Sequence, residues 1–381
     1  LVKEARTAHF NMLRVWGGGL YEPEAFYRAC DRNGILLWHD FMFACAPYPD
    51  YLDWFRDEVE REAIFQVRRL QRHACLALWC GNNENHWGFR DWWREQTRAG
   101  AWIYNYLLPR VVRRESPEIP YWNSSPYGGE APNSQEVGDH HLWGQIMMNP
   151  DMEKRINPEE YDRNPALFVS EFGYVGACTQ ETMIEALGGE PLDIGSKVWQ
   201  HHTNTFEKNT VLAGIRKHYR DPEGMTMQEY FLYSGLCQGL MLGYALESMR
   251  ANPACYGGLF WMYEDCWGEI GWTVIDYGLR RKPSWYFVRR AFAPLKLILR
   301  SAGEDRLRVV MANDTRTPFD GELEYGFISL DGTTQQLWRA PVQLAALSRA
   351  DPLVFPRGEH DPTTGVWMAR VPARPDICPA I

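Results

Sequence analysis

Short apolar runs alternate with amphipathic stretches along most of the chain. The apolar runs have the length of strands and few polar interruptions, which is typical of strands buried on both faces of a sheet. They cover residues 11–16, 35–41, 75–79, 121–125, 137–143, 166–173 and 256–265. Helical spacing of apolar residues predicts helices at about 50–73, 92–115, 196–219 and 225–250. This alternation predicts parallel strands joined by helical crossovers.

The number of strand candidates favours a barrel over an open sheet. Seven candidates occur up to residue 265, whereas a (β/α)8 barrel has eight strands. The chain opens on residues 1–10 as a helix that runs into a strand, so the eighth strand is expected before it. We therefore expect an α/β fold, a (β/α)8 TIM barrel that lacks its first strand. A doubly wound open sheet is the alternative, but no G-x-G-x-x-G motif follows the first strand.

The pattern changes near residue 295 to strand-like alternation with turn signals at Asn313-Asp314 and Asp331-Gly332. We expect two domains, a TIM-barrel catalytic domain at 1–295 and a β-sandwich, immunoglobulin-like domain at 296–381. The proline-rich tail after Pro352 is expected to be partly irregular.

Composition excludes several partner classes. The net charge is −9 and the basic residues form only short runs, so no nucleic-acid partner is expected. The apolar runs are too short to span a membrane. The nine cysteines form no C-x-x-C pair and lie mostly in apolar runs, so we predict free thiols, no metal, no cofactor and a cytoplasmic location. The 17 tryptophans suit either sugar faces or a large core.

Two carboxylates directly follow apolar runs. Glu84 comes after 75–79 and Glu171 after 166–170. In a barrel, residues after strand ends meet at the active-site face, where a carboxyl separation of roughly 5 Å fits a retaining glycosidase and about 6.5–9.5 Å an inverting one. One carboxyl group must then hold a proton while the other is ionised. The alternative is that each glutamate only caps a strand or forms a salt bridge.

Polar neighbours favour the catalytic interpretation. Asn83 is a neutral group suited to a sugar 2-hydroxyl, and Arg14 is suited to keeping one carboxylate ionised. Asn82 is expected to brace the loop. Adjacent His140 and His141 point to opposite faces of a strand and do not suggest a metal site.

Several of these segments occur together in one known family. They are RVWGGG (14–19), DFMFAC (40–45), GNNEN (81–85), GDHHLWG (138–144), FVSEFG (168–173) and FWMYEDCWGEIGW (260–272). In this order, over roughly residues 5–295, they resemble the family 2 glycoside hydrolases of the β-mannosidase type. The resemblance implies a retaining glycosidase that releases terminal β-D-mannose from β-mannosides without a cofactor.

The resemblance also assigns roles to residues. It implies that Glu84 is the general acid/base, that Glu171 is the nucleophile, that Asn83 contacts the 2-hydroxyl and that Arg14 lies near the nucleophile. Further pocket positions implied by the pattern are Trp16, Asp139, His141, Trp143 and Trp261. Trp92 is a further candidate for the pocket wall.

The chain departs from the family pattern in two ways. Glu264-Asp265 stands where the family usually has Asn-Asp. Family members also carry further domains and the first barrel strand before the point where this chain begins, so missing N-terminal domains of the same protein are expected. By itself the chain is expected to be poorly active. The alternatives are an endo-β-mannosidase acting on N-glycan cores and a non-catalytic carbohydrate-binding remnant.

Overall fold

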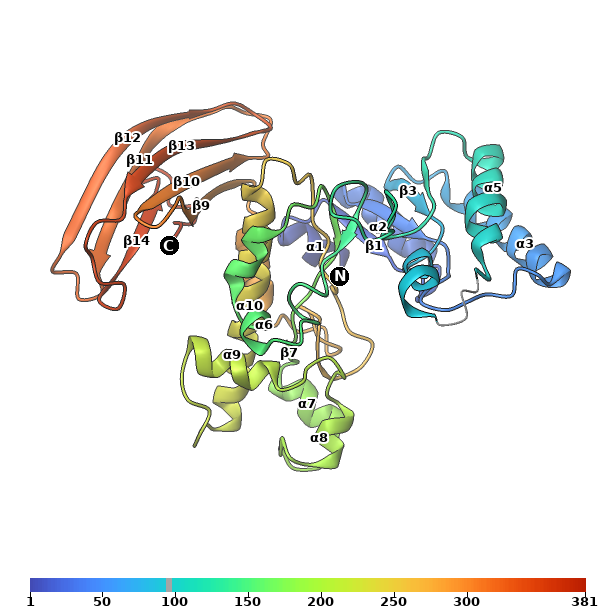
Figure 1. The fold of residues 1–381 in the computed structure, drawn as a ribbon, viewed down its shortest axis with the longest axis horizontal. Helices are drawn as coiled ribbons and strands as arrows, with labels where there is room; N and C mark the ends of the chain where they lie inside the picture. Colours follow the sequence, from blue (N-terminus) through green and yellow to red (C-terminus); the bar gives the residue numbers. More distant parts are fainter. Residues whose placement is uncertain (94–97) are drawn as a thin grey trace.

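The computed structural model describes residues 1–93 and 98–381, and the first part of the chain has an α/β fold (Figure 1). Its four-stranded parallel sheet has the order β1-β2-β3-β4, so each strand pairs with its neighbour in the sequence. The strands are β1 (Met12–Val15), β2 (Leu36–Asp40), β3 (Leu76–Cys80) and β4 (Tyr121–Trp122). A second parallel pair joins β5 (His140–His141) to β6 (Val169–Glu171). All six strands begin inside predicted strand segments.

Helices connect these strands, as the alternating pattern predicted. They include α2 (Glu24–Asn33), α3 (Asp53–Leu70) and α5 (Leu108–Glu115), and a further helix, α1 (Val2–Thr7), precedes β1. Pro23 precedes α2, and Gly34 ends it with a left-handed φ of 65° that glycine adopts without strain. Helices α3 and α5 pack against each other beside β3 (Figure 1).

The helix predicted at about 92–115 is only partly realised. Residues 94–97 lie outside the described residues. The rest contributes the last residue of the π-helix η1 (Gly88–Trp92), the π-helix η2 (Ile103–Leu107) and α5. The short helix α4 (Asn85–Trp87) leads directly into η1.

The strand predicted at 256–265 does not form a regular strand. It makes two isolated parallel bridges, from Gly258 to Val169 of β6 and from Glu264 to Ile275. Backbone hydrogen bonds of Leu259 and Trp261 continue toward β6 and the residue that follows it. On the side of β1 the segment makes ring contacts instead, since Phe260 packs on Phe10 and Trp261 packs on Trp16. A segment with only isolated bridges to different partners, and with Gly257 and Gly258 in it, has little to hold it in a ladder.

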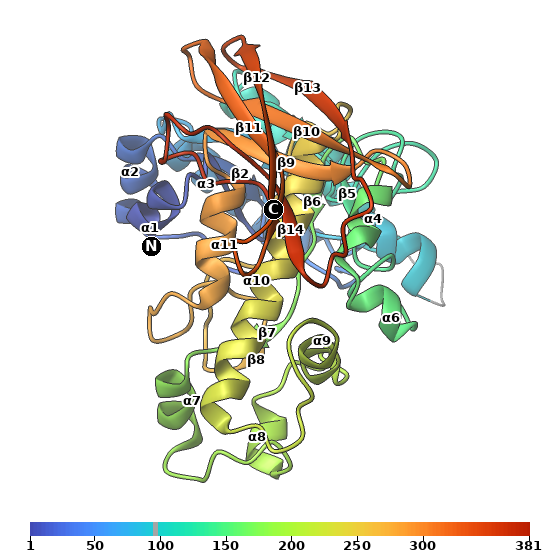
Figure 2. The ribbon, with the colours of Figure 1, turned by 90° about the vertical axis from the view of Figure 1, so that its left-hand side faces the viewer.

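The middle of the chain is mainly helical. Its elements are α6 (Met152–Arg155), the 3₁₀ helix η3 (Pro158–Arg163), β7 (Gly176–Ala177), α7 (Gln180–Leu187), α8 (Lys197–His201), α9 (Thr210–His218), α10 (Met227–Ala251), β8 (Ile270–Gly271) and α11 (Pro283–Ala291). The 25-residue helix α10 starts with a capping box formed by Thr226 and Glu229. It lies beside α11 (Figure 2), and α7, α8 and α9 gather at one of its ends (Figures 1 and 2). Among the described helices, none combines the length and apolar character needed to cross a membrane.

Two three-stranded antiparallel sheets form the last part of the chain. One has the order β13-β10-β9 and the other β12-β11-β14. The strands are β9 (Leu295–Ser301), β10 (Arg306–Asn313), β11 (Phe319–Ser329), β12 (Gln335–Leu344), β13 (Ser348–Pro356) and β14 (Gly365–Arg370). Both sheets contribute to one hydrophobic cluster, for example through Val309 and Leu323. Residues after Pro352, predicted as partly irregular, supply the end of β13 and all of β14.

The two parts of the chain meet at one end of α10 (Figure 1). Ala251 of α10 packs in a small buried cluster with Ile298 of β9 and Val310 of β10. Beside it, Lys296 forms a salt bridge of 2.7 Å with Glu247. The larger hydrophobic cluster lies within residues 2–291. Several tryptophans are buried in it, including the fully buried Trp79, Trp199 and Trp285, so part of the tryptophan content serves the core.

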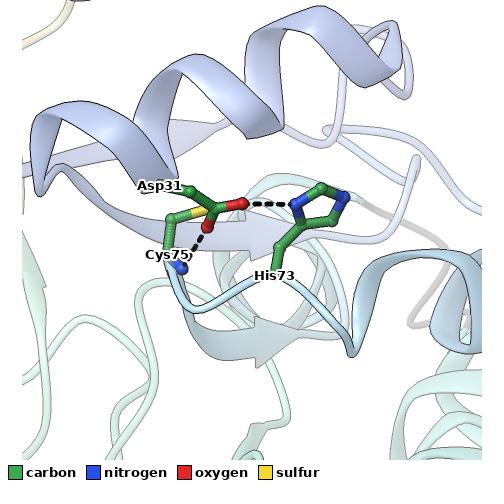
Figure 3. Close-up of side chains that lie close together, drawn as sticks. All are labelled: Asp31, His73 and Cys75. Atoms are coloured by element: carbon green, nitrogen blue, oxygen red, sulfur yellow. Dashed lines mark hydrogen bonds and ion pairs between the residues drawn. The ribbon is translucent and has the colours of Figure 1, made fainter.

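A polar bracket ties α2 to the start of β3 (Figure 3). Asp31 of α2 accepts a hydrogen bond from the backbone N–H of Cys75 at 2.8 Å. Its other carboxylate oxygen lies 2.6 Å from Nδ1 of His73, a residue whose side chain is only 5% exposed. The bracket holds the beginning of β3, whereas Glu84 follows the other end of that strand.

Replacement of Asp31 by alanine is expected to lower the free energy of unfolding by about 2–3 kcal/mol, because it leaves a buried N–H and a buried imidazole nitrogen without their acceptor. Urea unfolding followed by tryptophan fluorescence measures this change. Asp57→Ala, at an exposed position on α3, is the matched control and should change the value by less than about 0.5 kcal/mol. Equal effects of the two substitutions would contradict a stabilising bracket.

Candidate active site

Glu84 stands just beyond the end of β3, in a loop that turns its side chain inward. Its backbone has a left-handed φ of 64°, a conformation that costs a non-glycine residue about 1–2 kcal/mol. Two backbone hydrogen bonds of 2.7 Å hold it, from the Glu84 N–H to the Ser125 carbonyl and from the Gly88 N–H to the Glu84 carbonyl. Asn82 braces the loop as expected, since its side chain accepts from Ser124 Oγ and from the Asn85 N–H. The loop therefore fixes the position of Glu84.

Glu171 is the last residue of β6 and is held by two donors. Arg14 of β1 donates from Nη1 to Oε1 at 2.9 Å, and Trp143 donates from Nε1 to Oε2 at 3.1 Å. Arg14 is itself clamped by Asp40 at the end of β2, with Nε–Oδ1 and Nη2–Oδ2 distances of 3.2 and 2.7 Å. Such a two-point contact fixes the plane of the guanidinium group. The ends of β1, β2 and β6 thus converge on one carboxylate.

His141 of β5 lies between the two glutamates. Its Nδ1 atom is 2.7 Å from Oε1 of Glu84 and 3.2 Å from Oε2 of Glu171. One oxygen of each glutamate and one nitrogen of His141 all lie within 4.8 Å of one another, and all three residues are buried. The two carboxyl groups that the sequence placed 87 positions apart therefore share one small site.

Burial perturbs the two carboxyl groups, and their partners distinguish them. Burial raises the pKa of Glu84 to about 7, against a smaller lowering effect of the Cys45 thiol, which lies 3.3 Å from Oε2. Burial also raises the pKa of Glu171, but the directly contacting Arg14 guanidinium opposes that rise. Arg14 acts on Glu84 only at longer range. Glu171 is thus the group that ionises more readily, and Glu84 is the group that holds a proton near neutral pH.

Asn83 is partly occupied by protein contacts. Its Oδ1 accepts from Arg14 Nη2 at 2.9 Å, and its Nδ2 donates one hydrogen to Cys45 Sγ at 3.3 Å. The amide nitrogen carries two hydrogens, and Asn83 also hydrogen-bonds to Glu84, a contact that lowers the pKa of that carboxyl group.

The predicted aromatic residues fall into three places. Trp143 donates to Glu171, as described above. Trp16 and Trp261 form an edge-to-face pair with ring centroids 4.8 Å apart. Trp92 packs on Trp87 at 4.9 Å, and it is the Trp87 ring that faces His141, at 6.4 Å. The structure therefore places Trp87 between Trp92 and the carboxylates.

Asp139 lies behind the site. It is 3% exposed and accepts from Trp122 Nε1 and the Tyr127 N–H on Oδ1. Its Oδ2 accepts from the hydroxyls of Ser125 and Ser170. With four donors around it, Asp139 contacts the glutamates only through other side chains.

Four residues of the site were not among the predicted site residues: Asp40, Cys45, Trp87 and Ser125. Asp40 carried a signal, because it ends an apolar run as Glu84 and Glu171 do. Ser125 is the last residue of the predicted strand 121–125, Cys45 lies in a loop and Trp87 ends α4, and none of the three is an ionisable strand-end residue like the two glutamates. Their contacts arise from the packing of segments distant in sequence.

Within residues 1–93 and 98–381, two groups of side chains have the geometry to hold a metal ion: Glu84, His141 and Glu171 in the site, and Asp31, His73 and Cys75 in the bracket. In the site, the Arg14 guanidinium 2.9 Å from Glu171 would repel a cation. In the bracket, both oxygens of Asp31 already accept hydrogen bonds. The donor set of the site suits acid/base and nucleophilic chemistry better than metal binding.

Curated proteins similar to this chain include several β-mannosidases. No family model matches the chain. β-Mannosidase B of Aspergillus terreus is 30% identical over 384 aligned residues, which cover 92% of this chain and 44% of that protein. β-Mannosidase B of Aspergillus niger is 30% identical over 84% of this chain and 41% of its own length. The chain thus spans less than half the length of these relatives.

A β-mannosidase is also among the solved structures that resemble this chain. The β-D-mannosidase of Dictyoglomus thermophilum superposes with a TM-score of 0.88 at 36% identity, over 97% of this chain and 45% of that one. The exo-chitosanase CsxA of Amycolatopsis orientalis superposes with a TM-score of 0.70 at 15% identity, which indicates a shared fold only.

Proposed function

We propose that this chain, a homologue of the family 2 glycoside hydrolases of the β-mannosidase type, carries the catalytic residues of a retaining β-mannosidase. The observation that carries the proposal is the pair Glu84 and Glu171, which lie within 4.8 Å through one oxygen each. Retaining glycosidases place their carboxyl groups about 5–5.5 Å apart, and inverting enzymes leave about 6.5–9.5 Å for a water molecule. The spacing here supports direct attack by a carboxylate.

The two glutamates take different roles because their partners differ. Glu171, paired with Arg14, attacks the anomeric carbon and forms a covalent glycosyl ester. Glu84, which holds a proton near neutral pH, protonates the departing oxygen. Glu84 then removes a proton from water, and that water releases the sugar from Glu171. No cofactor takes part in these steps.

The remaining pocket residues bind the sugar in this proposal. Asn83, which lies beside Glu84, donates an N–H to the 2-hydroxyl. Trp143, His141 and Arg14 contact or flank the glutamates, while Trp16, Trp261 and Trp87 offer apolar faces to the ring. Asp139 supports the pocket from behind, and Trp92 extends the wall formed by Trp87.

For the architecture, we propose that the strands from β1 to β6 and the segment 256–261 belong to a (β/α)8 barrel at 1–295. The consecutive parallel pairing of β1 to β4 and the pairing of β5, β6 and Gly258 support this order. The two C-terminal sheets, which share one hydrophobic cluster, are proposed as a β-sandwich at 296–381.

A panel of 4-nitrophenyl glycosides tests the proposed substrate class. We expect release of nitrophenol from the β-D-mannoside at least about tenfold faster, in kcat/KM, than from the β-D-glucoside, β-D-galactoside and β-D-glucuronide, because an equatorial 2-hydroxyl cannot take the place of the axial one. Proton NMR of the first product formed should show β-mannose. First appearance of α-mannose would contradict the retaining mechanism.

The two alternatives give other outcomes. An endo-β-mannosidase would cleave an N-glycan core and leave the aryl mannoside intact. A carbohydrate-binding remnant would bind mannosides, measured by calorimetry, without any turnover.

A further inference from the structure

A chain of hydrogen bonds runs from the buried Asp139 to Glu84 through Ser125 and His141. Asp139 Oδ2 lies 2.7 Å from Ser125 Oγ, and Ser125 Oγ lies 3.0 Å from His141 Nε2. His141 Nδ1 lies 2.7 Å from Glu84 Oε1. All four residues are buried. Because the Ser125 carbonyl also accepts the backbone N–H of Glu84, one serine fixes both sides of the contact between His141 and Glu84.

The backbone of His141 is fixed as well. Asn133 accepts the His141 N–H at 2.8 Å and donates to the His141 carbonyl at 3.0 Å. The imidazole therefore has little freedom to turn away from Ser125 or Glu84.

The direction of donation follows from Ser125, which has a single O–H hydrogen. Three acceptors lie within reach of it: the Asp139 carboxylate, a neutral imidazole nitrogen and Ser170 Oγ, the last at 3.2 Å. The carboxylate is closer and, being charged, forms the stronger hydrogen bond. Ser170 places its own hydrogen on the same Asp139 oxygen at 2.5 Å. The lone pair of Ser125 Oγ then faces His141 Nε2, so Nε2 carries the ring hydrogen.

A neutral imidazole has one N–H, so Nδ1 of His141 presents a lone pair to Glu84. Burial lowers the pKa of His141 to about 4, which keeps the ring neutral near neutral pH. If Glu84 were ionised, a lone pair of its Oε1 would face the lone pair of His141 Nδ1 at 2.7 Å, which is repulsive. A protonated Glu84 instead donates a hydrogen bond to Nδ1.

We infer that the Asp139–Ser125–His141 chain locks His141 in the Nε2–H tautomer and thereby holds the proton on Glu84. The inference rests on the proposed role of Glu84 as general acid/base. His141 acts through Glu84 and is in this respect a positioning residue. In the first step the chain presents Glu84 as an acid. In the second, the facing lone pair makes the Glu84 carboxylate a stronger base toward water.

Other charged or titratable groups face this pair from neighbouring elements. Glu171 of β6 lies 3.2 Å from His141 Nδ1, and Arg14 of β1 neutralises it at 2.9 Å. The Cys45 thiol contacts the other oxygen of Glu84. Burial raises the pKa of Cys45 to about 12, so the thiol keeps its hydrogen and favours ionised Glu84. Beyond the effect of burial, proton retention by Glu84 therefore depends on the His141 side.

Nitrogen-15 NMR of histidine-labelled protein reads the tautomer directly, with His141→Gln used to assign the signal. The wild type should show a protonated Nε2 and an unprotonated Nδ1. In Ser125→Ala the Nε2 hydrogen loses its acceptor, so the ring should switch to Nδ1–H and donate to Glu84. Ser170→Ala removes the other hydroxyl on Asp139 without touching His141 and should keep the wild-type tautomer.

Asp139→Asn provides a second route to the same switch. Trp122 and Tyr127 both donate to Oδ1, so the amide nitrogen of the asparagine takes the Oδ2 position and donates to Ser125. The Ser125 hydrogen then loses its anionic acceptor and turns to His141 Nε2, which at 3.0 Å is nearer than Ser170 Oγ at 3.2 Å, and this moves the ring hydrogen to Nδ1. An Nδ1–H ring in the wild type, or an unchanged ring in both variants, would overturn the inference.

The pH dependence of kcat/KM is the second readout. A general acid is active while protonated, so the rate falls as pH rises through its pKa. Ser125→Ala and Asp139→Asn should move this alkaline limb down by about one pH unit, since a donor on Glu84 favours its ionised form. Ser170→Ala should leave the limb in place, and an unmoved limb in the first two variants would count against the inference. If the protein cleaves no mannoside, the proposed function fails, and the NMR spectra still decide the tautomer.

Discussion

Replacement of Glu171 by glutamine is expected to lower kcat/KM for 4-nitrophenyl β-D-mannoside by on the order of 10⁴-fold or more. Glutamine keeps the shape of the side chain and can still accept a hydrogen bond from Trp143. It cannot form a glycosyl ester, and it leaves Arg14 with Asp40 as its only charged partner among the described residues. The substitution therefore removes the nucleophile and keeps the shape of the pocket.

A covalent trap identifies the nucleophile independently of rates. A 2-deoxy-2-fluoro-β-mannosyl fluoride forms a slowly hydrolysed ester with the attacking carboxylate, so peptide mass spectrometry of the treated wild type should find the sugar on Glu171. Glu171→Gln should take up no label. Glu58→Gln, on the exposed face of α3, serves as control and should retain wild-type rates. Label on another carboxylate, or a loss below tenfold in Glu171→Gln, would refute the assignment.

The α/β alternation could be predicted from the sequence, because buried parallel strands are short apolar runs and helices separate them. The same feature located Glu84 and Glu171, since each directly follows such a run. It failed at 256–265, which looks equally apolar. There the number of hydrogen-bonding neighbours decides whether a strand forms, and a single segment does not encode that number.

The parts of the site that sequence reasoning missed are those created by tertiary packing. Ser125 contacts Glu84, Asp139 and His141, although the sequence marks it only as the end of the predicted strand 121–125. Cys45 reaches Glu84 across 39 positions of the sequence. Trp87 occupies the wall position expected of Trp92 because α4 leads straight into η1, and the turn of that helix brings the earlier tryptophan nearer to His141. Such contacts depend on loop conformation, which periodicity does not report.

The charge arrangement also explains why two similar carboxyl groups can act differently. Glu171 receives a guanidinium group that Asp40 holds in place. Glu84 is similarly buried, but it contacts two neutral groups, the Cys45 thiol and the His141 imidazole. Removing Arg14 would therefore blur the distinction between the two groups more than removing either neutral partner would, because a full charge acts strongly at short range in a buried site.

Replacement of Glu84 by alanine is expected to act selectively on substrates whose leaving group needs a proton. We expect kcat/KM to fall by about 10²–10⁴-fold for 4-methylphenyl β-D-mannoside, but by much less for the 2,4-dinitrophenyl glycoside, which departs without protonation. Azide, which fits the space left by the carboxylate, should restore turnover of the dinitrophenyl substrate and yield β-mannosyl azide. Burial raises the pKa of Glu84 to about 7, and the acid form is the active one. The wild-type rate should therefore fall as pH rises through about 7, and this alkaline limb should vanish in Glu84→Ala. Equal losses with both leaving groups, or a limb that persists in the variant, would assign the acid role to another residue.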